Sequence, residues 1–367
     1  MKKKHTDIVI QNMQGNRSSG SDFFNILDSK IFLSDGVSFD GFVPDYQTTG
    51  MIGEVVFNTG MTGYTESLTD PSYSGQILVF TYPMIGNYGV DKSTMESDKI
   101  QVNGVIVDTC EQDWSHNKST MSFISWLKEQ NIPIIFGVDT RALTKHLRTR
   151  GTMVGSIGKS KSDLSKVISE TKFVTIDKPI QYKSNGQKKV ILIDCGSKEN
   201  IVRSLRELPI TLKRVPHNYD FTKEEYDGIF ISNGPGNPED YNLAIANIKT
   251  AIKGSKSVFG ICLGSQLLAL ASGAKTYKMQ YGNRGHNQPC IEIETGRCYI
   301  TSQNHGYAVD HKSLSKDWKV IFKNLNDNSV EGLAHKTKPF YAVQFHPEAC
   351  PGPTDTSFLF ERFYKSL

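Results

Sequence analysis

The chain has 367 residues, of which 38% are hydrophobic and 22% charged, a composition typical of a globular protein long enough for two domains. The net charge is only +4 and no long block of like charges occurs, so we expect neither nucleic acid nor a membrane surface as a partner. None of the six cysteines forms a Cys-x-x-Cys pair, so we expect no metal site.

Polar residues dominate the start of the chain, where the run from Asn16 to Ser21 predicts a disordered extension over residues 1–26. The apolar stretch Ile8–Ile10 is too short for the core of a signal peptide, and no apolar run approaches the roughly 18–20 residues that a membrane helix needs. A chain of this size needs no disulfides, so we expect reduced thiols and a cytoplasmic location.

Residues 27–160 are rich in Gly and Thr and contain short apolar runs such as Glu54–Phe57, which predicts a separate N-terminal domain of mixed α/β structure. Residues 161–187 are richer in Lys, Ser and other polar side chains, and this composition predicts a linker.

In residues 188–367, apolar runs alternate with helical patterns, which predicts an α/β fold with a mostly parallel sheet and helices on both faces. The expected strands are Val190–Asp194, Gly228–Ser232 and Ser257–Ile261, and the expected helices are Glu199–Glu207, Asn242–Ile252 and Gln266–Ser272. Shorter strands are expected in the last third, at Cys298–Thr301, Lys319–Phe322 and Phe340–Phe345.

The third expected strand leads into Gly260-Ile261-Cys262-Leu263-Gly264, a Gly-x-nucleophile-x-Gly elbow with Cys at the nucleophile position. Glycines at these positions avoid clashes in a strained turn that lifts the sulfur above the sheet. The following helix N-terminus favours the thiolate, and the N–H of Leu263 is placed to bind an oxyanion. The alternative is that Cys262 is a small buried hydrophobe, as free cysteines often are. The flanking glycines favour the nucleophile.

A thiolate nucleophile for acyl transfer needs a histidine base that a third group orients. His346 is the best candidate because it follows an apolar strand and Glu348 places a carboxylate two residues away, with Pro347 restricting the backbone between them. His305 is the rival, and the alternative for either is a surface or structural histidine.

The loop Ser232–Pro238 follows a strand, as a phosphate-binding loop does, but it lacks the Lys-Ser/Thr of a P-loop and two prolines stiffen it. We interpret it as a rigid turn that presents a backbone N–H to a substrate. No nucleotide-binding motif is evident in the sequence.

Taken together with Asn304-His305-Gly306 and His346-Pro347-Glu348, these motifs resemble those of the class I (triad) glutamine amidotransferases. Further stretches in both halves are similar to the carbamoyl-phosphate synthetase small-subunit family: Gly53–Tyr64, Thr69–Tyr73, Asp139–Arg141, Leu267–Thr276, Ser302–Val309 and Pro351–Thr354. The resemblance covers about residues 27–367. It implies that residues 27–160 form the small-subunit domain and residues 188–367 the amidotransferase domain.

The resemblance implies that Cys262 is the nucleophile, His346 the base and Glu348 the residue that orients it. It also implies that Gly234 and Leu263 contact the substrate as oxyanion-hole donors. The remaining glutamine-binding residues that it implies are Ser72, Gly236, Gln266, Asn304, Gly306 and Tyr307. Ser265 departs from the family, which usually has His at that position.

The resemblance implies that L-glutamine is hydrolysed through a Cys thioester. The ammonia would pass to a synthetase large subunit that makes carbamoyl phosphate from bicarbonate and ATP. No cofactor is expected in this chain, because ATP and Mg²⁺ would be used by that partner. Two other hypotheses stay open, a stand-alone γ-glutamyl hydrolase or peptidase and a non-catalytic assembly subunit. The sequence does not decide between a free subunit and the glutaminase segment of a fused pyrimidine-pathway chain. The stretch Tyr281–Pro289 looks more like the glutaminase part of fused eukaryotic pyrimidine enzymes than like the usual bacterial small chain.

Overall fold

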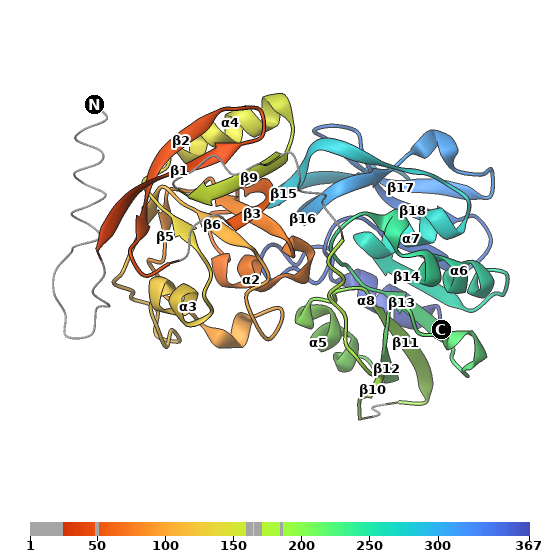
Figure 1. The fold of residues 1–367 in the computed structure, drawn as a ribbon. Helices are drawn as coiled ribbons and strands as arrows, with labels where there is room; N and C mark the ends of the chain where they lie inside the picture. The colour runs from red at the N-terminus through yellow and green to blue at the C-terminus, as the bar shows by residue number, and fades with distance from the viewer. Residues whose placement is uncertain (1–24, 48–50, 159–163, 165–170, 184–185) are drawn as a thin grey trace. The chain divides into compact units, whose positions relative to one another are not determined.

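The computed structural model describes residues 25–47, 51–158, 164, 171–183 and 186–367, and the chain divides into two compact units, Met1–Glu170 and Thr171–Leu367 (Figure 1). Residues 1–24 of the predicted extension lie outside the described residues. The predicted linker lies partly outside them too. Most of its described part, residues 171–183, belongs to the second unit, where β10 (Ile180–Gln181) pairs antiparallel with β12 (Ile210–Pro216). No helix in the described ranges has the length and apolar character needed to cross a membrane.

The first unit contains strands and short helices in alternation. In chain order they are β1 (Ile26–Leu33), β2 (Ser38–Pro44), β3 (Met51–Asn58), α2 (Tyr64–Thr69), η1 (Pro71–Tyr73), β4 (Gln76–Phe80), β5 (Met84–Ile85), η2 (Lys92–Thr94), β6 (Gly104–Ile106), β7 (Thr109–Cys110), α3 (Phe123–Glu129), β8 (Ile134–Ile135), α4 (Thr140–Arg150) and β9 (Met153–Gly158).

Seven of these strands form one mixed sheet in the order β2-β1-β9-β3-β4-β6-β8. β3, β4, β6 and β8 run parallel, whereas β9, β1 and β2 are antiparallel to their neighbours. Phe123 and Trp126 of α3 and Tyr64 of α2 pack in one cluster with Leu78 and Val105 of the sheet. This is the mixed α/β domain that the sequence predicts.

The second unit is a larger α/β unit. Its further elements are β11 (Lys188–Asp194), α5 (Glu199–Glu207), η4 (Phe221–Lys223), β13 (Gly228–Ile231), η5 (Pro238–Asp240), α6 (Asn242–Ala251), β14 (Ser257–Ile261), α7 (Leu263–Ala271), β15 (Thr276–Glu292), β16 (Cys298–Val309), η6 (His311–Ser313), β17 (Trp318–Asn324), β18 (Val330–His335), β19 (Phe340–Val343) and α8 (Phe358–Lys365).

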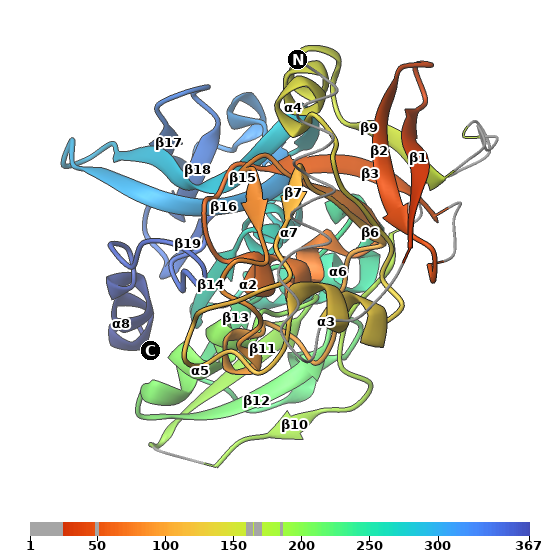
Figure 2. The ribbon, with the colours of Figure 1, turned by 90° about the vertical axis from the view of Figure 1, so that its left-hand side faces the viewer.

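Its ten-stranded sheet has the order β10-β12-β11-β13-β14-β19-β18-β17-β15-β16. The five strands from β12 to β19 in that order are parallel, and Figure 2 shows β11, β13 and β14 side by side. The other five strands extend the sheet with antiparallel pairing. The predicted mostly parallel core is confirmed, with an antiparallel extension that the sequence did not indicate.

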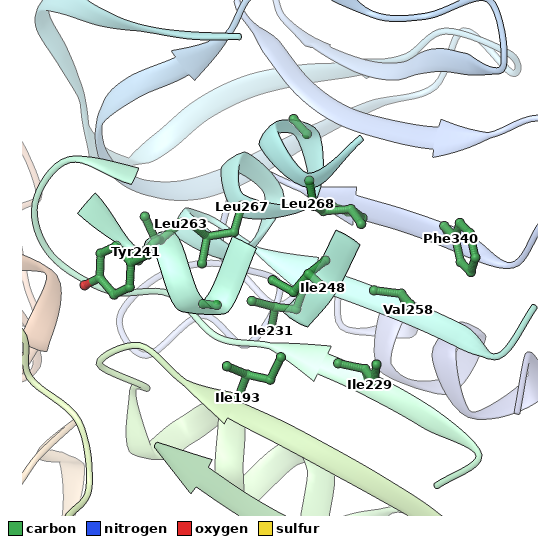
Figure 3. Close-up of a cluster of buried hydrophobic side chains, with 14 of the residues drawn as sticks. Ile193, Ile229, Ile231, Tyr241, Ile248, Val258, Leu263, Leu267, Leu268 and Phe340 are labelled. Atoms are coloured by element: carbon green, nitrogen blue, oxygen red, sulfur yellow. The ribbon is translucent and has the colours of Figure 1, made fainter. Parts of the chain in front are cut away.

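Helices cover both faces of the parallel strands because successive residues of a strand point to opposite sides. On one face, Ile193 of β11 packs in a cluster with Ile248 of α6 and Leu267 of α7 (Figure 3). On the other face, Leu192 of the same strand packs in a cluster with Phe363 of α8. The strands therefore read as continuous apolar runs, which is why they could be predicted.

The expected strands Lys319–Phe322 and Phe340–Phe345 are confirmed by β17 and β19, whereas the expected length of the strand at Cys298–Thr301 is wrong. β15 and β16 are 17 and 12 residues long and pair with each other as an antiparallel ribbon, where the sequence predicted only Cys298–Thr301. These strands are rich in polar residues, so cross-strand pairing and not an apolar pattern decides their conformation. Helix α7 also begins earlier than the expected start at Gln266, because the elbow leads directly into it.

Candidate active site

Cys262 lies at the turn between β14 and α7, with backbone angles of φ 53° and ψ −108°. A positive φ is strained for a residue with a side chain and persists only where the surroundings enforce it. Here the Cys262 N–H donates to the carbonyl of Val343 in β19 at 2.9 Å. The turn therefore holds the thiol at the carboxyl ends of the parallel strands, where open α/β sheets bind ligands.

The two glycines of the elbow are required by close backbone contacts. A Cβ on Gly260 would lie 2.5 Å from the carbonyl oxygen of Gly264, and a Cβ on Gly264 would lie 2.2 Å from the carbonyl oxygen of Ile231. Neither contact is tolerable, because the atoms met are backbone atoms. The sequence predicted that glycines at these two positions avoid clashes in the turn, and the structure confirms it.

Gly234 and Leu263, the two predicted oxyanion donors, lie next to each other. A Cβ on Gly234 would be 2.8 Å from Cδ2 of Leu263 and 2.1 Å from the carbonyl oxygen of Cys195. Leu263 is the first residue of α7, so its N–H has no acceptor within the helix. The loop Ser232–Pro238 thus packs against the side chain of Leu263, the residue that follows Cys262.

His346 and Glu348 form a buried pair. His346 Nδ1 lies 2.6 Å from Glu348 Oε1, and both side chains are buried. His346 Nε2 is also buried and has no nitrogen or oxygen partner among the described residues. Burial disfavours the charged imidazolium, but the charges of Glu348 and Cys262 outweigh burial and raise the pKa of His346 to about 10. This arrangement favours the imidazolium form of His346.

Lys198 is a functional candidate that the sequence reasoning missed. Its Nζ lies 3.0 Å from Glu348 Oε1 and 2.5 Å from the carbonyl of Ala349, and only 4% of its side chain is exposed. Burial raises the pKa of Glu348, but the charges of Lys198 and His346 outweigh it and lower that pKa to about 2. One signal was available, because Lys198 closely follows the strand β11 at the same sheet edge as the elbow.

His305, the rival base, has a different environment. It is buried in β16, with Nδ1 2.9 Å from the carbonyl of Tyr307 and Nε2 3.1 Å from Oε1 of Gln303. Burial lowers its pKa to about 4. With both ring nitrogens engaged and the ring neutral, His305 is suited to shaping β16, and the geometry favours His346 as the base.

Two of the predicted glutamine-binding residues, Asn304 and Gln266, contact Cys262. Its Sγ lies 3.6 Å from the carbonyl of Asn304 in β16. Gln266 Nε2 donates to the carbonyl of Tyr307 at 2.9 Å and to Oε1 of Gln344 at 3.0 Å, so the amide hydrogens of Gln266 are used within the protein. Ser265, the departure from the family, donates from Oγ to the carbonyl of Cys262 at 2.8 Å.

The other three predicted glutamine-binding residues have separate surroundings. Gly236 has φ +84° and is covered by Thr171. Gly306 lies in β16, and a Cβ added to it would lie 3.1 Å from a guanidinium nitrogen of Arg284. Ser72 lies in the first unit, in η1, where its N–H donates to Asp70 Oδ1 at 2.9 Å. The roles of these residues in binding glutamine stay predictions.

Both units match families of known proteins. Residues 31–157 match the carbamoyl-phosphate synthase small chain, CPSase domain, and residues 191–366 match glutamine amidotransferase class-I. The arginine-specific small chain of carbamoyl phosphate synthase from Candida albicans is 45% identical to this chain, and the matched region covers 92% of this chain and 84% of that protein.

Other relatives are much longer than this chain. The multifunctional protein CAD of Squalus acanthias is 48% identical over 91% of this chain, which spans 16% of that protein. The mitochondrial carbamoyl-phosphate synthase (ammonia) of Mus musculus is 44% identical over 92% of this chain, which spans 23% of it. The two domain matches, together with a relative that this chain covers over most of its length, show that the chain belongs to the carbamoyl-phosphate synthase small chain family.

Proposed function

We propose that the chain is the glutaminase subunit of a glutamine-hydrolysing carbamoyl-phosphate synthetase, with Cys262 as nucleophile, His346 as base and Glu348 as its orienting carboxylate. The proposal depends chiefly on one arrangement. Glu348 engages Nδ1 of His346 at 2.6 Å, which leaves Nε2 for the thiol on the elbow. Membership of the small chain family supports the same assignment.

In the first half of the reaction, the Cys262 thiolate attacks the side-chain amide carbon of glutamine. The negative charge that develops on the amide oxygen is stabilised by the backbone N–H groups of Gly234 and Leu263. The carbon–nitrogen bond then breaks, and His346 gives its Nε2 proton to the departing nitrogen. Ammonia leaves, and a γ-glutamyl thioester remains on the sulfur.

In the second half, neutral His346 takes a proton from a water molecule, which attacks the thioester carbonyl. The carbon–sulfur bond breaks, glutamate is released, and the thiolate–imidazolium pair is restored. The balance is glutamine plus water to glutamate plus ammonia. The low pKa of Glu348 suits this cycle, since its carboxylate stays charged each time His346 changes its protonation.

We further propose that the partner is a synthetase large subunit that takes up the ammonia and uses ATP, Mg²⁺ and bicarbonate. Ammonia released into water at neutral pH becomes ammonium and is no longer a nucleophile, so direct transfer has a chemical advantage. A cytoplasmic location is part of the proposal and is supported by six free cysteines.

The proposal predicts that Cys262→Ser separates the two half-reactions. A serine hydroxyl is far less acidic than a thiol, so glutamine-dependent carbamoyl phosphate formation by the chain with a large subunit should fall by about 10³-fold or more. Synthesis from added ammonium chloride should persist, because it bypasses the nucleophile. Glutamine hydrolysis by the chain alone is measured in parallel.

Cys298→Ser is the matched control, since Cys298 is an exposed cysteine on β16. Near-normal glutamine hydrolysis by the Cys262→Ser variant would exclude Cys262 as the nucleophile. Glutaminase activity that no large subunit alters would favour the stand-alone hydrolase. Absence of hydrolysis in the wild-type pair would favour the non-catalytic assembly subunit.

A further inference from the structure

A short segment at the start of the second unit, Thr171–Ile176, lies against the loop that carries Gly234 and Gly236. We call this segment the strap. The hydroxyl of Thr171 accepts a hydrogen bond from the Asn237 N–H at 3.1 Å and donates one to Oδ2 of Asp240 in η5. The Thr171 side chain also covers Gly236. A Cβ added to Gly236 would lie 2.3 Å from the methyl carbon of Thr171.

An aromatic cluster makes a second connection between the strap and the loop. The ring of Phe173 stacks on that of His217 at 4.7 Å and meets the edge of Tyr241 at 4.9 Å. Tyr241 is buried, and its hydroxyl donates to the carbonyl of Pro235 at 2.9 Å. Pro235 lies between Gly234 and Gly236, so Phe173 supports the loop through Tyr241.

The far end of the strap is fixed to the turn after β11. Thr175 Oγ1 donates to the Asp194 carbonyl at 2.7 Å, and the Ile176 N–H donates to Asp194 Oδ2 at 3.2 Å. Asp194 Oδ1 accepts from the N–H groups of Gly196 and Ser197 at 2.9 and 2.8 Å, in the turn that leads to Lys198. The strap is therefore anchored to a rigid part of the site.

We infer that the strap is a positioning element for glutamine, and that Thr171 sets the conformation of Gly236 and Asn237 in the substrate loop. This inference rests on the proposed function of the site. The contacts of Gly234 do not involve Thr171, since Gly234 packs directly on Cys195 and Leu263. Loss of the Thr171 hydroxyl should therefore weaken glutamine binding more than it slows the chemical step.

The test is Thr171→Val in the full chain, assayed for glutamine hydrolysis and, by calorimetry, for glutamine binding. Valine keeps the shape of threonine but leaves the Asn237 N–H and the Asp240 carboxylate without their partner. We expect KM and Kd for glutamine to rise about tenfold while kcat stays within about threefold of wild type. Thr171→Ser keeps the hydroxyl and should restore both constants to within about threefold.

Thr250→Val is the matched control, because Thr250 is an exposed threonine on α6 whose hydroxyl donates to the Ala246 carbonyl at 3.1 Å. Asp240→Ala removes the acceptor of the hydrogen bond that Thr171 donates. This variant replaces Thr171→Val in the test if Thr171→Val fails to fold. It should raise KM by about threefold.

The inference is overturned if Thr171→Val and Asp240→Ala have the same KM and Kd for glutamine as Thr250→Val. It is also overturned if Thr171→Ser raises KM and Kd as much as Thr171→Val does. These two results would not affect the proposed function, because the wild-type chain would still hydrolyse glutamine. A wild-type chain that binds but does not hydrolyse glutamine would count against the proposed function alone. The Kd values of the variants for glutamine would then still test the role of the strap. If the wild-type chain neither hydrolyses nor binds glutamine, both proposals are wrong.

Discussion

A buried ammonium group, that of Lys198, lies against the carboxylate that orients His346. The two pKa shifts of the His346–Glu348 pair give this site a stability optimum in pH. Glu348, with its pKa lowered from 4.5 to about 2, stabilises the fold fully above pH 4.5, and that contribution is lost as pH falls toward 2. His346, with its pKa raised from 6.5 to about 10, stabilises it fully below pH 6.5, and that contribution is lost as pH rises through 10.

Lys198→Met should therefore move acid unfolding to higher pH. Without the ammonium group, Glu348 keeps only His346 as a charged partner, so its pKa rises and less of its stabilisation survives in acid. Breaking a buried ion pair costs up to about 3–5 kcal/mol. The measurement is the free energy of unfolding in urea between pH 3 and 7.

Lys249→Met, at an exposed lysine of α6, is the control for that experiment. We expect the difference between the two variants to be largest above pH 4.5, where Glu348 is fully charged. Equal stability of the two variants across the range would show that the Lys198–Glu348 pair contributes nothing to folding.

At the scale of elements, the site depends on how closely α7 approaches the parallel strands. Gly264 lies in the first turn of α7, and its Cα faces the backbone of Ile231 at the end of β13. Because neither backbone can yield without displacing a whole element, the helix start and the strand end are held together. The positive φ of Cys262 depends on this contact.

Gly264→Ala should separate α7 from β13 and disturb the elbow. The added methyl would lie 2.2 Å from the Ile231 carbonyl oxygen, and overpacking of this kind costs about 1–3 kcal/mol, with more where only backbone can move. We expect a lower free energy of unfolding together with a lower kcat, since Cys262 and Leu263 both shift. Chemical denaturation and the glutaminase assay measure the two effects.

Gly254→Ala is the comparison, since a Cβ there meets only the Ala251 carbonyl oxygen at 3.3 Å. That variant should keep the activity of the wild type. A Gly264→Ala chain with unchanged stability and activity would mean that the elbow relaxes without loss, and that the glycine is not required.

At the scale of the whole molecule, the two units have separate hydrophobic cores, and the first unit matches the small chain CPSase domain over residues 31–157. Its family-like stretches contain no catalytic constellation of their own apart from the predicted glutamine contact of Ser72. We therefore expect the first unit to be the main docking surface for the large subunit.

Residues 171–367 produced alone should then fold but fail to co-purify with a synthetase large subunit, whereas the full chain should co-purify. The boundary is placed at Thr171, and not at residue 188, because the strap packs on the second unit. Circular dichroism and a cooperative unfolding transition check that the fragment is folded. Co-purification of a folded fragment with the affinity of the full chain would contradict this expectation.

The parts of the site that could be predicted from sequence are those with short-range causes. Val190–Asp194 and Ser257–Ile261 are apolar because strands buried on both faces must be, and the structure has strands at both places. Gly260 and Gly264 flank Cys262 because the turn leaves no room for a side chain. His346 and Glu348 are two residues apart, so their pairing was also within reach of sequence reasoning.

Only the tertiary structure decided the interactions that join distant segments. Lys198 and Glu348 are 150 residues apart in the chain, and no local pattern indicates that they meet. His305 and His346 could be ranked only by burial and by the partners of their ring nitrogens, since these fix the charge of each ring. Folding must satisfy buried hydrogen bonds and charges across the whole unit, whereas a sequence pattern reports the demands of one element at a time.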